Sequence, residues 1–225
     1  MMNDLIFQLH SPEEFRYLSS LGHWIAGYVF LGVSIIAFLQ ALGLFKSKQY
    51  LWPLLVVVAG IIFIPYSFLH HGFEKLDLVF KVIQLDPQQR QHIIMFNLLF
   101  VAGLVELLLS LKKIQGKLWQ FVWPGTLFII GYLFLTHPQH GTAEARAYSL
   151  LFHTILGSVI LLAGVFRMAT VIWSRKYKWV TYGWILFLFI TSIMLITYNE
   201  PKGAYQMDSS LQQQNNQHMN PTHGN

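Results

Sequence analysis

Long apolar stretches alternate with short polar segments along the chain. A transmembrane helix needs roughly 20 mostly apolar residues. Six stretches reach that length, at residues 18–44, 51–69, 87–111, 118–136, 143–173 and 179–198. The pattern therefore predicts an all-α fold: a polytopic membrane helix bundle with six transmembrane helices. Its partner is the lipid bilayer.

Polar signals mark the ends of these stretches. Ser11-Pro12-Glu13-Glu14 is typical of a capped helix start, and Asp86-Pro87 repeats the pattern before the third stretch. Residues 72–85 carry apolar side chains at helical spacing with charges between them, which predicts a short helix lying in the membrane interface. We expect residues 1–200 to form the bundle with a short N-terminal interfacial segment, and 201–225, rich in Gln and Asn, to be a disordered polar tail.

The composition supports a membrane protein. Charged residues make up 11% of the chain and hydrophobic residues 54%, whereas a soluble domain carries about 25% charged residues. The net charge of +5 does not indicate nucleic acid binding, because the basic residues fall in short loops between the apolar stretches. The chain has no cysteine, which excludes disulfides, iron–sulfur clusters and thiolate metal sites.

The distribution of basic residues predicts the topology. Three connecting loops contain basic residues and no acid: Lys46 and Lys48; Lys112, Lys113 and Lys117; and Arg175, Lys176 and Lys178. The positive-inside rule places these loops in the cytoplasm. Both termini then lie outside, in a multi-pass protein of the cell membrane.

Histidines gather at the opposite, predicted extracytoplasmic ends of the stretches. This set comprises His23, His70, His71, His92, His137, His140 and His153. Imidazole is the commonest metal-binding side chain and suits zinc and copper, and a catalytic zinc site typically uses three protein ligands. We therefore predict a divalent metal site. Its strongest candidate ligands are His23, His92, His137 and His153, with the other three as alternates.

Such a site would serve metal handling or metal-assisted hydrolysis, and the sequence leaves open whether the protein is an enzyme. In the hydrolytic case a metal-bound water is the nucleophile and Glu144 a candidate general base. Two ionisable residues inside the predicted spans, Glu106 and Arg167, lie at similar depth. Because an unpaired charge there is costly, we predict a structural Glu106–Arg167 ion pair.

Two alternatives remain open. In the first, two of the histidines are axial ligands of haem b. Gly27 and Gly157 follow His23 and His153 by one helical turn, which would leave room for a macrocycle, although small residues also permit close helix packing. In the second, the protein is a non-catalytic scaffold or accessory subunit whose histidines face water, a partner membrane protein or another copy of the chain.

Three motifs, in the same order, resemble the transmembrane protein 45 family of small polytopic membrane proteins. They are Gly22-His23-x-x-x-Gly27; Gln91-His92-x-x-Met95 with Gly103 and Glu106; and Gly131-Tyr132-Leu133-Phe134 leading to His137. This chain has HPQH where the family has HxH, and six predicted spans where the family usually has seven. The resemblance implies a membrane bundle with outer-face histidines and no established activity.

Overall fold

A computed structural model describes residues 11–45, 47–69, 76–173 and 177–206. In these ranges every regular element is helical and there is no strand. The elements are α2 (Pro12–Ala41), α3 (Leu51–Leu69), α4 (Leu76–Leu85), α5 (Pro87–Ser110), the 3-10 turn η2 (Leu118–Phe121), α6 (Val122–Leu135), α7 (Ala143–Ile172) and α8 (Lys178–Thr197). The all-α prediction is confirmed for this part of the chain.

The predicted capping signals start these helices. Ser11 Oγ accepts a hydrogen bond from the Glu14 backbone N–H at 3.3 Å, and Glu14 Oε2 accepts one from the Ser11 backbone N–H at 2.8 Å. Asp86 caps α5 by accepting from the Gln88 N–H at 2.8 Å. These contacts satisfy backbone donors that have no partner within the first helical turn.

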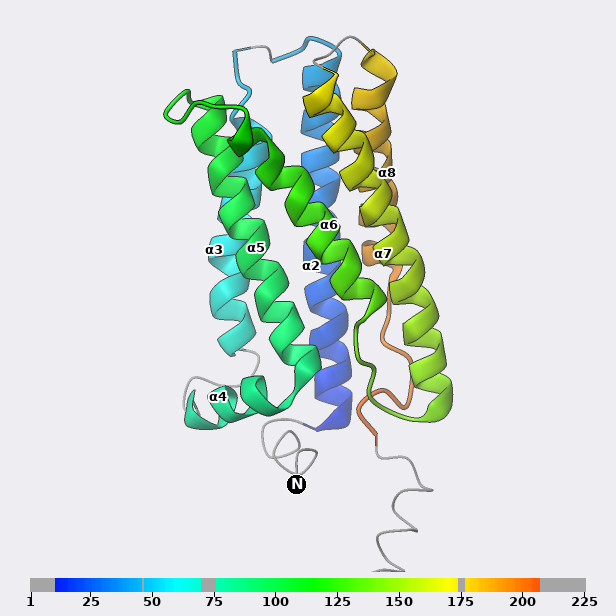
Figure 1. The fold of residues 1–225 in the computed structure, drawn as a ribbon. Coiled ribbons are helices and arrows are strands. Elements are labelled where there is room, and N and C mark those ends of the chain that lie inside the picture. The colour runs from blue at the N-terminus through cyan, green and yellow to red at the C-terminus, as the bar shows by residue number, and fades with distance from the viewer. Residues whose placement is uncertain (1–10, 46, 70–75, 174–176, 207–225) are drawn as a thin grey trace, which may run out of the picture.

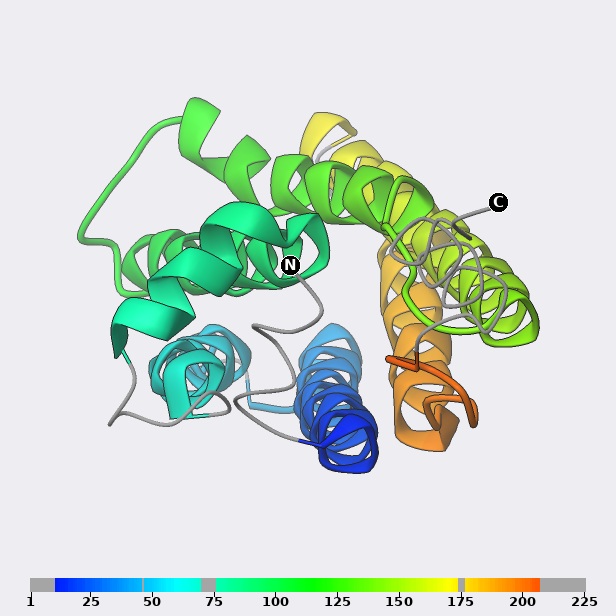
Figure 2. The ribbon, with the colours of Figure 1, turned by 90° about the horizontal axis from the view of Figure 1, so that it is seen from below.

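The long helices form a two-layer bundle (Figure 1). Seen from below, α3, α2 and α8 form one layer, and α5, α6 and α7 form the other (Figure 2). Neighbours pack in a closed circuit in the order α2, α3, α5, α6, α7, α8 and back to α2. The short helix α4 crosses one end of the bundle, as expected for the predicted interfacial segment (Figure 1).

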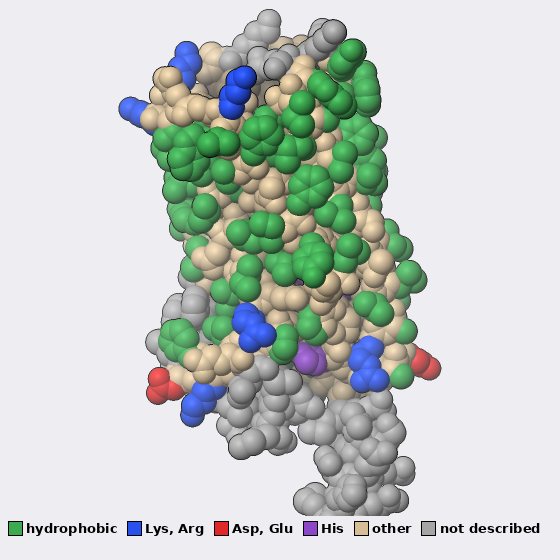
Figure 3. Space-filling view, in the orientation of Figure 1, with side chains coloured by type: hydrophobic (Ala, Val, Ile, Leu, Met, Phe, Trp, Pro, Cys, Tyr) green, Lys and Arg blue, Asp and Glu red, His purple; other side chains and the backbone are tan. Residues whose placement is uncertain are grey.

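Five of these segments are long and apolar enough to cross a membrane: Pro12–Ala41, Pro87–Ser110, Leu118–Leu135, Ala143–Ile172 and Trp179–Thr197. The apolar stretch of α3 is shorter, at Leu51–Ile64. On the face seen in Figure 3, hydrophobic side chains lie over the middle of the bundle and charged side chains lie near its two ends. This distribution supports an integral membrane protein whose outer face contacts lipid.

The two ends of the bundle differ in chemistry. We call the end that carries the α2–α3, α5–α6 and α7–α8 connections the lysine end, because Lys48, Lys112, Lys113 and Lys117 lie there. We call the opposite end, formed by the start of α2, the α4–α5 and α6–α7 connections and residues 197–206, the histidine end. All five described histidines lie at the histidine end or within a few turns of it.

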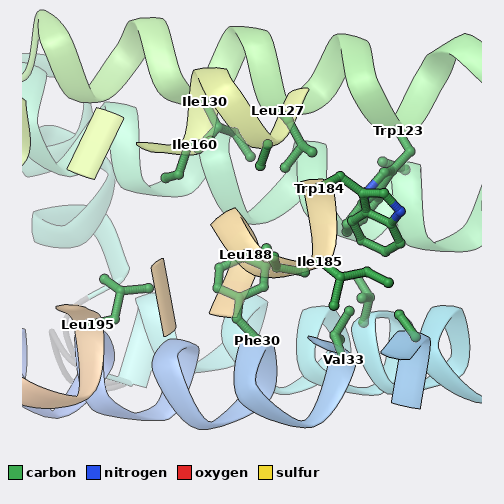
Figure 4. Close-up of a cluster of buried hydrophobic side chains, with 14 of the residues drawn as sticks. Phe30, Val33, Trp123, Leu127, Ile130, Ile160, Trp184, Ile185, Leu188 and Leu195 are labelled. Carbon is green, nitrogen blue, oxygen red and sulfur yellow. The ribbon is translucent and has the colours of Figure 1, made fainter. Parts of the chain in front are cut away.

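The core between the layers is built from apolar side chains of α2, α3, α5, α6, α7 and α8, and Figure 4 shows part of it. Leu127 and Ile130 of α6 lie against Ile160 of α7, while Phe30 of α2 and Leu188 of α8 lie opposite them. These side chains are 9% exposed or less. Because lipid is as apolar as these residues, the close packing itself must stabilise the bundle.

An ion pair lies in the core toward the lysine end. Arg167 Nη2 of α7 donates to Glu106 Oε1 of α5 at 3.0 Å, and the side chains are 18% and 8% exposed. The Arg167 guanidinium lies 5.2 Å and 5.9 Å from the ring centres of Trp184 and Trp52. The two charges that the sequence pairs are therefore in direct contact.

Ordered chain continues beyond Glu200, where sequence analysis places the start of the tail. Ala204 and Tyr205 are buried, and the Gly203 carbonyl accepts a hydrogen bond from the Thr142 N–H at 3.1 Å. Residues 201–206 thus pack against the loop before α7. The remainder of the predicted tail, 207–225, lies outside the described residues.

Candidate functional site

Four histidines from four segments meet at the histidine end. His23 comes from α2, His92 from α5, His153 from α7, and His137 from the loop directly after α6. The ring centres are 6.2 Å apart for His23 and His92, 4.8 Å for His92 and His137, 5.0 Å for His137 and His153, and 5.9 Å for His153 and His23. We call these four residues the histidine quartet. They are the residues that the sequence ranks as strongest ligands.

Hydrogen bonds orient three of these imidazoles. His23 Nδ1 lies 2.7 Å from the Ser19 carbonyl, and His153 Nδ1 lies 2.7 Å from the Ser149 carbonyl. A carbonyl oxygen only accepts, so Nδ1 carries the proton in both rings and Nε2 presents a lone pair. Gln139 Nε2 is also 3.3 Å from His153 Nδ1, but the shorter carbonyl contact determines the tautomer.

His137 follows the same pattern through a side chain. Its Nδ1 lies 2.6 Å from Gln91 Oε1, which accepts the proton of the ring. Nε2 of His137 and Nε2 of His153 are buried and make no hydrogen bond to any described residue. Buried polar atoms normally have a hydrogen-bond partner. The lone pairs on these two buried Nε2 atoms therefore suggest a missing partner.

The environment keeps His137 neutral. Burial lowers the pKa of His137 well below its ordinary value, and the nearby imidazoles of His92, His153 and His23 lower the pKa further. The neutral imidazole is the form that binds metal ions.

The quartet is not arranged as a finished ligand set. Within the described ranges, no three His, Asp or Glu side chains are placed around a single point as metal ligands. The ring planes of His92 and His137 are inclined at 69°, and those of His23 and His92 at 85°. Any common ion would need rotation of these rings about their side-chain bonds.

A buried carboxylate lies beside the quartet, which the sequence analysis did not identify. Glu200 is 3% exposed, and Glu200 Oε2 accepts a hydrogen bond from the Tyr198 hydroxyl at 2.7 Å. Ser19 Oγ donates to Glu200 Oε1 at 3.0 Å. The Tyr198 ring centre is 4.7 Å from that of His23, so the hydroxyl–carboxylate pair lies directly beside the quartet.

The surroundings of Tyr198 raise the pKa of its hydroxyl. Burial is the largest cause, and the Glu200 carboxylate adds to it. Tyr198 therefore stays protonated and acts as a donor. The sequence signal that could have identified Glu200 is an acidic residue directly after the last apolar stretch, two residues beyond Tyr198.

Other predicted site residues lie elsewhere. His140 Nε2 is 3.1 Å from Asp86 Oδ1 and faces α5 rather than the quartet. Burial raises the pKa of Asp86, but the interaction with His140 and the backbone N–H groups of Gln88 and Gln89 together outweigh it, so the net shift is downward. Glu144 is exposed in the first turn of α7. The remaining alternates, His70 and His71, lie outside the described residues.

The glycines below His23 and His153 serve helix packing. A β carbon on Gly27 would lie 2.7 Å from an Ile196 side-chain carbon of α8, and one on Gly157 would lie 2.7 Å from the Gly131 carbonyl oxygen of α6. Neighbouring helices thus fill the space that a macrocycle would need at these two positions. This observation favours the packing interpretation over the haem interpretation.

A cavity of about 100 Å³ opens beside the quartet. His23 and His92 line it, together with further side chains from α2, α3, α5, α6, α7 and α8. Its deeper wall is apolar. The histidine site is therefore connected to an empty hydrophobic space within the bundle.

Comparisons with known proteins give no relative: no protein-family model matches the chain, and no curated protein matches it significantly in sequence. The resemblance to the transmembrane protein 45 family stays a prediction that rests on its three motifs.

Proposed function

We propose that this integral membrane protein binds one divalent transition metal ion, zinc or copper, through the histidine quartet. The observation that carries the proposal is the pair of buried Nε2 atoms on His137 and His153, which lack any described hydrogen-bond partner while their Nδ1 atoms are engaged. In metal-binding histidines, the ring nitrogen that does not bind the metal typically donates a hydrogen bond to a carbonyl or carboxylate oxygen. Binding would occur with rotation of the four rings toward one ion.

The ligand set favours a nitrogen-preferring metal. Four imidazoles without thiolate match zinc and copper, and they are poor ligands for magnesium or calcium, which prefer oxygen. Metal handling needs no more than this set. In metal-assisted hydrolysis, a metal-bound water would need a nearby base, and Glu200 is better placed for that role than the exposed Glu144 because Glu200 is buried and its partner Tyr198 contacts His23.

Elemental analysis of detergent-purified protein tests the proposal. We expect about one metal ion per chain, and at least a tenfold loss in the double variant His92→Ala, His137→Ala. The matched control is His140→Ala, because His140 lies in the same loop but pairs with Asp86. Equal metal content in the double variant and the control would refute the proposal.

Two further measurements separate the alternatives. A visible spectrum with a Soret band would support haem b instead. A colourless, metal-free protein that keeps its fold would support the non-catalytic scaffold or accessory subunit. Size-exclusion profiles of each variant provide the test of folding.

A further inference from the structure

The cavity beside the quartet is polar at one end and apolar for the rest of its length. Its apolar wall includes Ala26 and Phe30 of α2, Phe96 and Leu99 of α5, and Phe134 of α6. Its polar end is lined by Ser19, His23, Tyr66, Gln89, His92 and Tyr205. A ligand that fits both ends must itself be amphipathic.

A second small cavity lies beside the first one, nearer the middle of α3. It has a volume of about 20 Å³ and shares the wall residues Ala26, Phe30, Phe96 and Leu99 with the first cavity. Val56, Ala59, Gly60 and Phe63 of α3 form its remaining wall with Val29 of α2. The two cavities therefore lie next to each other between α2, α3 and α5, and we refer to them together as the slot.

The size of the slot limits what can occupy it. Buried water needs two to four polar partners each, which the apolar wall does not offer. A volume of about 100 Å³ is too small for a turn of protein helix, which is about 10 Å across with its side chains. The volume has room for a few methylene groups, and hydrocarbon chains are the commonest apolar molecules in a bilayer.

The polar end indicates the head group. Among the described residues, its lining contains hydroxyl, amide and imidazole groups and no lysine, arginine or carboxylate. These groups suit an uncharged head that donates or accepts hydrogen bonds. A charged head such as a carboxylate would meet no cation in this lining and would lie near the buried Glu200.

We propose that the slot binds the head and first methylenes of a single-chain lipid with an uncharged, hydrogen-bonding head, of the class of long-chain alcohols or aldehydes. The chain would enter along α2, α3 and α5, and the head would lie at His23 and His92. Binding of the chain needs no metal. A role for this lipid as the substrate of the metal site rests on the proposed metal function.

Photolabelling tests the lipid site. The probe is hexadecanol with a diazirine early in its chain, added to the purified full chain in detergent, with and without prior removal of metal by a chelator. We expect labels, mapped by mass spectrometry, near Phe30 and Leu99. Excess hexadecanol should compete at least tenfold better than palmitate on the chelator-treated protein.

Filling the slot should abolish the labelling. Gly22 lines the cavity, and a β carbon there would lie 3.5 Å from Tyr66 Cε1, which is an ordinary contact. Gly22→Leu should reduce labelling at least tenfold. The matched control Gly125→Leu should not change it, because no heavy atom lies within 4 Å of a β carbon at Gly125 and that residue does not line the cavity.

Two results would overturn the lipid site. One is labelling confined to outward-facing residues such as Ile35, Phe38 and Val101 in the wild-type protein, a test that needs no variant. The other is unchanged labelling in a folded Gly22→Leu protein. Labelling that persists after metal removal supports the lipid site even if elemental analysis refutes the metal site, so the two proposals fail separately.

Discussion

The Glu106–Arg167 pair offers the sharpest test of how this bundle handles charge. Replacing Glu106 with Leu leaves the Arg167 guanidinium in the core, where it is 18% exposed and cannot lose its proton. Breaking a buried pair by removing one partner costs about 3–5 kcal/mol. We expect Glu106→Leu to lower the free energy of unfolding by that amount, with little dependence on pH.

The opposite variant, Arg167→Leu, leaves the Glu106 carboxylate in the core without its partner. We expect it to be destabilising as well, by about 3–5 kcal/mol, because either single change breaks the buried pair.

The double variant should be close to wild type. Glu106→Leu with Arg167→Leu removes both charges, and buried pairs replaced by apolar residues are often neutral or stabilising. Arg167 Nε already lacks a hydrogen bond to any described residue, so little polar contact is lost with it. We expect the double variant to lie within about 2 kcal/mol of wild type.

Unfolding by SDS in mixed micelles, followed by circular dichroism, measures these differences. The control cycle uses the pair of Glu13 and Arg16, which lie 2.8 Å apart with side chains 61% and 32% exposed and should contribute about 1 kcal/mol or less. The reasoning fails if the double variant is as unstable as Glu106→Leu.

Three further predictions use the same assay. Gly157→Ala should destabilise the fold by about 1–3 kcal/mol because its β carbon would meet the Gly131 carbonyl. The control Gly125→Ala should not destabilise the fold, and equal effects of the two variants would contradict the packing role of Gly157. Tyr198→Phe removes the hydrogen bond to Glu200 and should cost about 1.5–3 kcal/mol, against less than about 0.5 kcal/mol for the exposed Tyr148→Phe. The third prediction concerns the lowered pKa of His137 in metal-free protein. Below about pH 6.5 the unfolded chain takes up a proton at this residue, whereas the folded chain does not. Acidification from pH 6.5 should therefore lower the free energy of unfolding by up to about 1.4 kcal/mol per pH unit. His137→Gln should reduce that slope, and an unchanged slope would show that His137 does not contribute to it.

The sequence by itself determined the helical membrane character of this protein. Apolar stretches long enough to cross a bilayer leave few alternatives to helices, since backbone groups in lipid must find hydrogen bonds within their own segment. The helix starts at Ser11 and Asp86 follow from side chains that cap their own first turn, which is a local effect. The placing of histidines at one end follows from counting residues along each stretch.

Tertiary structure decided which of these histidines meet. His137 and His140 are three residues apart in one loop, yet the first joins His92 and the second pairs with Asp86. That division depends on the path of the loop, which packs against Gly203 where a β carbon on Gly141 would clash. No local pattern encodes this path, because its contacts come from residues about 60 positions further along the chain.

The carboxylate beside the quartet was decided in the same way. Glu200 follows the last apolar stretch, and only the packing of α8 against α2 brings it to Ser19, 181 residues away in sequence. Conversely, Glu144 is near the histidines in sequence but points outward from the first turn of α7. The sequence determined which groups reach the histidine end. Packing between helices decided which of these groups are buried together, because their distances in space do not follow their distances along the chain.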